Sequence, residues 1–420
     1  MNKLIFSLIK GLYNAVYEYI FTFDKNKSFI KFVDTISREN IFYIKIFQGL
    51  GTNTNLFNDE QSEYLKKFLD NVPYDNTDIY QDLHNQLIEV GNKNEEHKID
   101  VDTLKIINSG VIGIVYKGVM NEKDIVVKVI KNNIEEKIYS ALQDYKSIIN
   151  FITYFSLFKF YYIEDIFNSN KDLLINQLDF RNEVDNIETF YKNNQHTDYV
   201  EVPYVYKEFT KHNNKIIVMD YLEGKKLFDL NNEERSIYLE QIVNFSYKSI
   251  LFNKNFHCDL HPGNVIFMDN PKRLGVIDYG IIGEISRQQQ DFVYNFFNES
   301  MKNKNFIEAS KIIIMNCTTI VNGNPSSNAN NITNENINEY NCIILELSKL
   351  IHELIDNKHN LDAHYIYMIN KILFKKNLKL AEFFCKIELS FGISDSLCKK
   401  LIDNTSLIDV AIKIFQNFDI

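Results

Sequence analysis

The stretch from His257 to Asn264 reads HCDLHPGN, and the later triplet from Asp278 to Gly280 reads DYG. In kinase-type sites, an aspartate five residues before an asparagine, followed by an aspartate ahead of a glycine, supplies one base and two metal ligands around a polyphosphate. A carboxylate that does not hold the metal can orient an attacking hydroxyl or water and accept its proton, which fits Asp259. Mg²⁺ prefers hard oxygen ligands, which Asn264 and Asp278 supply.

The two histidines of this stretch allow another interpretation. His257 and His261 are four residues apart, so they could be metal ligands on a helix or ordinary surface residues. Pro262 and Gly263 argue against a helix at this point. We therefore favour the phosphotransfer interpretation, because it needs several residue types at fixed offsets.

Two short apolar runs separate Asn264 from Asp278. We expect Val265–Phe267 and Leu274–Ile277 to form buried strands, with a turn at Asn270–Lys272 between them. Such a hairpin would carry Asn264 and Asp278 to the same edge of a cleft.

Upstream, residues 108–115 read NSGVIGIV, the pattern of a strand, turn and strand that covers phosphates. Gly110 and Gly113 would let backbone amides approach the phosphates, although Asn108 stands where a first glycine is usual. The apolar run after this loop ends in Lys128, where the cation for the α and β phosphates is expected. If the stretch from His257 to Asn264 were absent, we would interpret these residues as an amphipathic hairpin with a solvated lysine.

A helical pattern with apolar residues at i, i+3 and i+4 spacing begins near Gln177 and carries Glu183, our candidate partner of Lys128. That assignment rests on its order in the chain, since most helical glutamates are solvated.

Lys215–Gly224 reads as a buried strand that runs into a hinge, which suits adenine binding. Catalytic roles are expected for Asp259, Lys128 and Glu183. The residues expected to bind the cofactor, ATP with Mg²⁺, are Asn108, Gly110, Gly113, Val115, Val126, Lys128, Met219, Asp220 and Leu222.

The ordered set of motifs resembles the UbiB, or aarF-domain-containing (ADCK), atypical kinases of the protein-kinase-like superfamily. Lys45-Ile46-Phe47-Gln48 is similar to the family's KxGQ signature, and Gln177-Leu178-Asp179 to its ExD motif. The HxDxHPGN type of loop completes the resemblance, which extends from about Ile41 into the carboxy-terminal helices.

In that family, the KxGQ lysine and the first ExD glutamate are thought to pair and to fold the extension over the active site. The resemblance implies a regulatory role for Lys45, Gln48, Gln177 and Asp179. Phe47 replaces the motif's glycine and Gln177 its glutamate, so Gln177 can accept a hydrogen bond from Lys45 but cannot form an ion pair. We therefore expect the contact that folds the extension over the active site to be weaker in this chain. The nucleotide loop also departs from the family's AAAS pattern.

The segment after Gly280 limits the substrate. A protein kinase carries an activation segment that ends in Ala-Pro-Glu, whereas here Ile281–Ile285 leads directly to Ser286–Gln289, the capping-box start of a helix. A protein substrate is therefore disfavoured. We expect a small molecule, a lipid or water as the acceptor.

The predicted fold is α+β, a protein-kinase-like two-lobe fold with a helical amino-terminal extension and a mostly helical C-lobe. We expect the extension and its connection at residues 1–97, the N-lobe with inserted helices at 98–222, and the C-lobe at 223–420. Further helices are expected near Ile79 to Val90 and Ile134 to Phe155, and Asn322–Asn338 reads as a polar surface loop.

The composition excludes some partners. The net charge is −10, with no basic stripe interleaved with aromatic residues, so nucleic acid is disfavoured. Five cysteines without CxxC spacing indicate a cytoplasmic or other reducing compartment, and no secretory signal is expected. Leu4–Phe21 and Ile148–Ile163 are interrupted by polar residues, so neither should span a membrane. We expect the first to be an amphipathic helix on the kinase core; peripheral membrane attachment is the alternative.

The residues leave three functional hypotheses. The first is an atypical kinase or ATPase of UbiB type. The second is a small-molecule phosphotransferase similar to aminoglycoside or choline kinases, which share the loop type but lack the signature between Lys45 and Pro73. The third is a nucleotide-binding pseudokinase scaffold without turnover.

Overall fold

The computed structural model describes most of the chain, namely residues 3–40, 42, 60–61, 64, 72, 74–153, 171, 175–320, 332–356, 363–403, 405 and 407–417. The chain forms two compact units. The first comprises Met1–Glu188 and Tyr204–Tyr221, and the second comprises Thr189–Pro203 and Leu222–Ile420.

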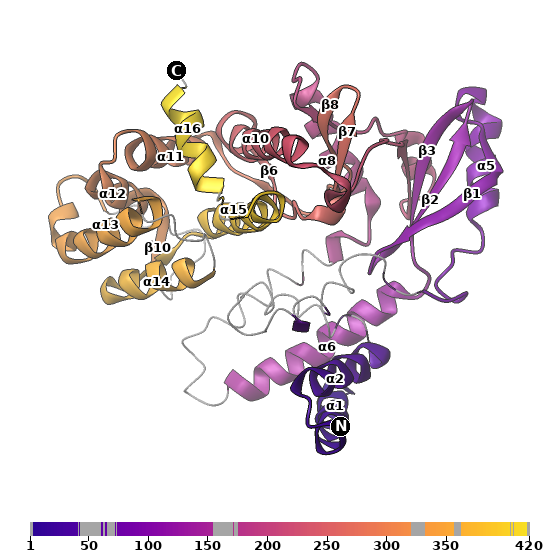
Figure 1. Cartoon of the computed structure of the whole chain (residues 1–420), viewed down its shortest axis with the longest axis horizontal. Helices are drawn as coiled ribbons and strands as arrows, with labels where there is room; N and C mark the ends of the chain where they lie inside the picture. Colours follow the sequence, from indigo (N-terminus) through magenta and orange to yellow (C-terminus); the bar gives the residue numbers. More distant parts are fainter. Residues whose placement is uncertain are drawn as a thin grey trace. The chain divides into compact units, whose positions relative to one another are not determined.

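The first unit contains a four-stranded antiparallel sheet in the order β1-β2-β3-β5 (Figure 1). Its strands are β1 (Ile99–Ser109), β2 (Gly113–Met120), β3 (Lys123–Ile130) and β5 (Ile216–Asp220). The strands predicted around Lys128 and before the hinge are thereby confirmed. Because side chains alternate along a strand, β3 presents Val127 and Val129 on one face and Val126 and Lys128 on the other.

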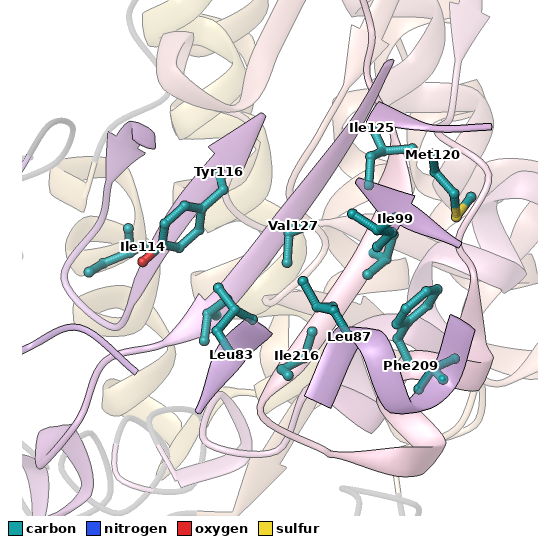
Figure 2. Packing of buried hydrophobic residues seen from close by; sticks show 13 residues of the cluster. Leu83, Leu87, Ile99, Ile114, Tyr116, Met120, Ile125, Val127, Phe209 and Ile216 are labelled. Atoms are coloured by element: carbon teal, nitrogen blue, oxygen red, sulfur yellow. The ribbon is translucent and has the colours of Figure 1, made fainter. Parts of the chain in front are cut away.

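The face with Val127 and Val129 forms the core of this unit. Figure 2 shows its apolar side chains packed with those of α5 (Leu83–Lys93) and Phe209 of α9 (Lys207–His212). Leu87 and Val127 are fully buried, and each such side chain stabilises the fold by about 1.5–3 kcal/mol. The core therefore occupies one face of the sheet, and the face that carries Lys128 is left for function.

Helix α5 begins later than the sequence pattern predicts. The pattern predicts a helix near Ile79 to Val90, but turns occupy the residues before Leu83. The carboxylate of Asp75 accepts a hydrogen bond from the Thr77 amide (2.7 Å), which favours a turn over a helix there.

Helices α1 (Lys3–Thr22) and α2 (Lys25–Glu39) pack against each other, and α1 also contacts α6 (Ile134–Thr153) (Figure 1). The predicted helices at these positions are confirmed. The buried side of α1 is made of Leu4, Ser7, Gly11 and Ala15, and a Cβ on Gly11 would lie 3.0 Å from the Phe32 ring.

Most of the large apolar side chains of α1 are exposed, namely Ile5, Phe6, Ile9, Leu12, Tyr13, Val16, Tyr17, Tyr19, Ile20 and Phe21. The small residues Ser7, Gly11 and Ala15 allow close packing on the buried side, so most bulky side chains point outward. Among the described helices, none has both the length and the apolar character that crossing a bilayer requires.

Helix α8 (Phe180–Asn194) carries the predicted apolar stripe, since Val184, Ile187 and Phe190 are all buried. The helix starts at Phe180 because the Asp179 carboxylate accepts a hydrogen bond from the Arg181 amide (3.0 Å), as helix-capping residues do. Glu183 therefore lies in the first turn of α8.

The second unit contains the predicted hairpin. Strand β7 (Val265–Asp269) pairs with β8 (Lys272–Val276), and β8 pairs in parallel with β4 (Val200–Glu201). A separate ladder joins β6 (Asn255–His257) to β9 (Ile282–Glu284). Gly283 is required in β9, because a Cβ there would lie 2.2 Å from the Phe256 ring.

Helices make up most of the second unit. They are α10 (Asn232–Lys248), α11 (Arg287–Phe297), α12 (Phe306–Asn316), α13 (Asn341–Asp356), α14 (Ala363–Leu373), α15 (Glu382–Leu401) and α16 (Leu407–Asn417). Strands β10 (Thr318–Ile320) and β11 (Leu378–Leu380) form a short ladder. The predicted capping box at the start of α11 is confirmed, with Ser286 and Gln289 each bonding the other's backbone. Most of the predicted polar loop, residues 322–331, lies outside the described residues.

A carboxyl group on α15 makes the stability of the protein depend on pH. Burial raises the pKa of Glu388 from its ordinary 4.5 to about 8, and its Oε2 atom is enclosed without a hydrogen-bond partner. The pKa of Glu388 is higher in the folded protein than in the unfolded chain. Its protonated carboxyl group therefore contributes fully to stability below pH 4.5, and this contribution is lost as the pH rises through 8. Relative to Glu388→Gln, we expect the free energy of unfolding of the wild type to fall by up to about 4 kcal/mol over this range. Urea denaturation of both proteins at several pH values measures it, and a difference that does not change with pH would contradict the expectation.

Candidate active site

Lys128 and Glu183 form an ion pair, although they are far apart in the sequence. The Lys128 Nζ atom lies 2.7 Å from Oε1 and 2.9 Å from Oε2 of Glu183. The Lys128 side chain is 16% exposed and that of Glu183 is 6% exposed, so the pair is largely desolvated. Strand β3 presents the lysine and the first turn of α8 presents the glutamate. Such a pair fixes the amine in one place, which a phosphate-binding lysine requires.

The sheet places other predicted residues on the face that carries Lys128. Residues opposite each other on neighbouring strands share a face, and the register pairs Val115 with Lys128 and Val126 with Met219. Asn108 pairs with Val115 at the end of β1. Apolar side chains therefore flank the amine, and of these Val126 and Met219 are buried.

The turn between β1 and β2 is closed by its own backbone. The Gly110 amide donates to the Gly113 carbonyl (2.9 Å), and the Asn108 side chain accepts from the Ser109 amide (2.7 Å). A Cβ on Gly113 would lie 3.0 Å from the Val129 carbonyl oxygen, so glycine permits the close approach of β2 and β3. Asn108, which stands in place of the usual glycine, orders the loop with its side chain.

Asp220 has its side chain on the other face. Its register partner is Ile125, which belongs to the core face. The Asp220 carboxylate accepts a hydrogen bond from the Tyr206 hydroxyl (2.8 Å) and pairs with Lys123 (2.7 Å). Any contact of Asp220 with a nucleotide would therefore involve its backbone.

In the second unit, His257 joins the two predicted catalytic segments. Its Nε2 donates to the Asp278 carbonyl oxygen (2.5 Å), and its Nδ1 accepts from the Asp259 amide (3.1 Å). Burial lowers the pKa of His257, which favours the neutral ring that this arrangement needs. His257 lies in β6, so the alternative of two metal-binding histidines on a helix is wrong. The histidine instead fixes the backbone around both aspartates.

Further contacts hold the Asp259 loop. The Ser390 hydroxyl on α15 donates to the His257 carbonyl oxygen (2.6 Å). The His261 Nδ1 atom accepts from the Gly263 amide (3.0 Å), and its Nε2 lies 3.8 Å from the Asp259 carboxylate. The Asp259 side chain is 38% exposed, so it is open to solvent. A base must be accessible in this way to reach an acceptor.

Asn264 and Asp278 have the donor chemistry of a magnesium site. The Asn264 amide nitrogen donates to the Asp259 carbonyl oxygen (2.9 Å), which turns its Oδ1 atom away from that contact. The Ile277 amide donates to the Asn264 carbonyl oxygen (3.0 Å), so the β7–β8 ladder brings Asn264 beside Asp278. Two oxygen ligands suit Mg²⁺, which completes its shell with water and phosphate. Among the described residues, no group of three or more His, Cys, Asp or Glu could hold a metal ion.

The segment after the predicted hinge is tied to β7. Lys225 and Phe267 exchange both backbone hydrogen bonds (2.8 and 3.0 Å). A Cβ on Gly224 would lie 2.6 Å from the Phe267 carbonyl oxygen, so glycine is needed there. Leu222 lies beside Gly275 of β8, because a Cβ on Gly275 would be 3.0 Å from the Leu222 Cδ1 atom.

The predicted regulatory residues are only partly described. Lys45 and Gln48 lie outside the described residues. Gln177 lies half-buried in a turn, and Asp179 caps α8 and pairs with Arg181. Part of the extension reaches the nucleotide loop, because the Val72 amide donates to the Ser109 carbonyl oxygen (2.5 Å).

Residues 80–310 match the family model of the ABC1 atypical kinase-like domain. The chain belongs to the ABC1 atypical kinase-like family. It therefore has a mixed α+β, kinase-like fold, as the sequence predicted, and the resemblance to UbiB and ADCK proteins is confirmed.

Relatives of this ABC1 chain agree with the family. It is 29% identical over 255 residues (58% of this chain, 46% of the relative) to an "Uncharacterized protein in hydrogenase 1 5'region" of Clostridium pasteurianum. It is 28% identical over 273 residues (61% and 48%) to a "Probable protein kinase UbiB" of Shewanella baltica. The chain thus spans about half the length of these relatives. A solved structure, the complex of Rv3197 with erythromycin from Mycobacterium tuberculosis, aligns with a TM-score of 0.49 at 15% identity, covering 85% of this chain and 88% of that one.

Sequence reasoning missed two residues of this ABC1 site. The sequence pattern treats His257 only as a metal ligand or a surface residue, and it gives no role to Ser390. Ser390 lies 133 residues from the histidine whose carbonyl it contacts, so no local pattern could have indicated it. For His257, its position two residues before the predicted base was a signal.

Proposed function

We propose that this ABC1 chain binds Mg-ATP and transfers the γ-phosphoryl group to a small-molecule or lipid-type acceptor or to water. The observation that carries the proposal is the desolvated contact of 2.7 Å between Lys128 and Glu183. Keeping the largely buried lysine amine charged costs desolvation energy, and a paired glutamate offsets it only in part. A bound polyphosphate explains why the charge is kept there.

Each residue has a role in this proposal. Lys128 contacts the α and β phosphates, and Glu183 positions its amine. Val115, Val126 and Met219 offer an apolar surface to adenine. The loop that contains Asn108, Gly110 and Gly113 covers the phosphates, and Leu222 and the Asp220 backbone belong to the hinge.

In the second unit, Asp259 accepts the proton of the attacking hydroxyl group or water. His257 binds the backbone of both Asp259 and Asp278 and thereby fixes where their carboxylates lie. Asn264 and Asp278 would hold Mg²⁺, which neutralises phosphate charge when bound. No nucleic-acid partner is proposed.

The class of acceptor is proposed from the short segment after Gly280. This segment contains only strand β9 and the capping residue Ser286 before α11 begins at Arg287. It has no Ala-Pro-Glu platform for a peptide, which supports a small acceptor. The exposed apolar side chains of α1 support a lipid-type acceptor and peripheral membrane contact in a reducing compartment.

The proposal also includes regulation by the extension. Lys45 and Gln48 would approach Gln177 and Asp179, with a hydrogen bond in place of an ion pair. The boundaries proposed from the sequence, near residues 97 and 222, would separate the extension, the nucleotide-binding lobe and the C-lobe.

A nucleotide titration tests the proposal. We expect ATP to stabilise the purified chain against thermal unfolding in the presence of Mg²⁺, by about 2.7 kcal/mol at a hundred times the Kd. The melting temperature is measured with ATP, with Mg²⁺ alone and with both, and ADP release is measured in parallel. A melting temperature that does not change when Mg-ATP is added would refute the proposal. Stabilisation without ADP release would identify a nucleotide-binding scaffold instead.

A further inference from the structure

A buried serine on α15 reaches the strand that leads into the Asp259 loop. Ser390 is 2% exposed, and its hydroxyl donates to the His257 carbonyl oxygen at 2.6 Å. Helix α15 packs against β6 (Figure 1) and against β9, so the contact lies where the helix meets this ladder. All three elements belong to the second unit. The hydrogen bond therefore joins the carboxy-terminal helices to the start of the catalytic loop.

The direction of this hydrogen bond is unusual for a serine within a helix. Helical serines commonly bond the carbonyl oxygen four residues earlier, in their own helix. The buried Ser300 and Ser310 of this chain do so, each at 2.7 Å. Ser390 instead bonds a carbonyl that lies 133 residues away in the sequence. A serine that served only its own helix would not require that contact.

The ladder of β6 and β9 leaves the His257 carbonyl to another donor. Hydrogen-bonded and non-hydrogen-bonded pairs alternate along an antiparallel ladder. The Cys258 amide donates to the Ile281 carbonyl oxygen (3.1 Å), so the neighbouring pair, His257 with Ile282, is of the non-hydrogen-bonded kind. The His257 carbonyl therefore points away from β9, on a residue that is only 4% exposed. A buried carbonyl without a donor is costly, and Ser390 supplies the donor.

The ring of the same histidine holds both proposed catalytic aspartates. His257 accepts from the Asp259 amide and contacts the Asp278 carbonyl oxygen. Because the ring and the carbonyl belong to one residue, a shift at the end of β6 moves the ring as well. Asp278 has a second fixed point, since its Oδ1 atom accepts from the Gly280 amide. Loss of the Ser390 contact should therefore displace Asp259 more than Asp278.

We propose that Ser390 is a positioning residue, whose hydroxyl holds the end of β6 so that His257 places Asp259 for proton acceptance. This inference rests on the proposed phosphotransfer function and deepens it, because it adds α15 to the site. The Ser390 hydroxyl bonds backbone and no carboxylate, so it acts through His257. Catalytic groups need to be held within about 0.5 Å, and a misplacement of about 1 Å can cost about 100-fold in rate.

Ser390→Ala tests this inference against a matched control, Ser394→Ala. Ser394 lies one turn further along α15, is 1% exposed, and accepts a hydrogen bond from the Ser246 hydroxyl (3.1 Å). Each variant loses one buried hydroxyl contact, so both should lower the melting temperature by similar amounts. Only Ser390→Ala should lower kcat for ATP turnover, by about tenfold, with the KM for ATP within about twofold of the wild type. Ser390→Thr keeps the hydroxyl and should recover most of the lost turnover.

Amide hydrogen exchange without nucleotide tests the positioning separately from catalysis. The loop is held by hydrogen bonds that four of its own amides donate, namely those of Asp259, His261, Gly263 and Asn264. We expect the peptide that contains these amides to exchange about fivefold faster in Ser390→Ala than in the wild type or Ser394→Ala. This measurement decides the inference even if the wild type turns over no ATP, a result that would count against the proposed function alone.

Two results would overturn the inference. The first is a Ser390→Ala protein that matches Ser394→Ala in both ATP turnover and amide exchange. The second is a Ser390→Thr protein that turns over ATP as slowly as Ser390→Ala, because the hydroxyl would then have no role. Faster exchange and a lower kcat that are confined to Ser390→Ala would support it.

Discussion

Asp278→Asn should lower ATP turnover about 100-fold or more while the protein stays folded. The Asp278 Oδ1 atom accepts a hydrogen bond from the Gly280 amide (2.9 Å), which an asparagine oxygen can also accept. The substitution therefore keeps the size and this contact of the side chain and removes its charge. A metal ligand that loses its charge stabilises the transition state less, and about 100-fold corresponds to about 3 kcal/mol.

The measurement is steady-state ADP release at several Mg²⁺ concentrations, together with the Kd of ATP with and without Mg²⁺. We expect Asp278→Asn to weaken the Mg²⁺-dependent part of ATP binding and to leave Mg²⁺-free binding unchanged. Asp269→Asn is the matched control, because Asp269 ends β7 in the same hairpin and pairs with Lys225 (3.2 Å). Its turnover should stay within about twofold of the wild type. Turnover by Asp278→Asn close to that of the control would exclude a metal-binding role.

Lys128→Met and Glu183→Gln should each lower turnover and stability, and the double variant should be little worse than either. Removing one partner leaves the other charge desolvated, which costs about 3 kcal/mol of the free energy of unfolding. Removing both partners relieves that cost. Turnover should likewise be non-additive, because Glu183 is proposed to act only by positioning the Lys128 amine.

The chain offers a matched control on the same helix. Glu188 of α8 pairs with Lys207 at 2.9 Å, but these side chains are 28% and 44% exposed. Lys207→Met and Glu188→Gln should therefore cost less than about 1 kcal/mol and leave turnover unchanged. Urea denaturation and ADP release are measured for the single and double variants of both pairs, which gives a double-mutant cycle for each pair. Additive losses at Lys128 and Glu183, or a Glu183→Gln protein that behaves like Glu188→Gln, would contradict the proposed positioning.

The local structure near the site could be predicted from the sequence. The β7–β8 hairpin was indicated by two apolar runs around a turn sequence, and the start of α11 by Ser286 and Gln289. The apolar stripe of α8 was indicated by its helical spacing. These features depend on residues close together in the chain. The start of α5 was missed because Asp75 forms a turn that the apolar pattern does not reveal.

The partners of the site residues were less predictable. Glu183 was selected by its order in the chain, although an exposed glutamate would have fitted the same pattern. Only the structure shows that Glu183 is buried beside Lys128 while Glu188, further along the same helix, is more exposed.

The sequence by itself determined the family, the order of the motifs and the helices and strands that carry them, because hydrophobic periodicity and turn residues act over a few neighbours. The tertiary structure alone decided which distant side chains meet: Lys128 with Glu183, His257 with the Asp278 carbonyl, and Ser390 with the His257 carbonyl. Those contacts depend on burial, which removes competing water and makes a buried polar group costly unless a partner is present. Burial is set by the packing of the whole unit and not by the residues on either side of each position.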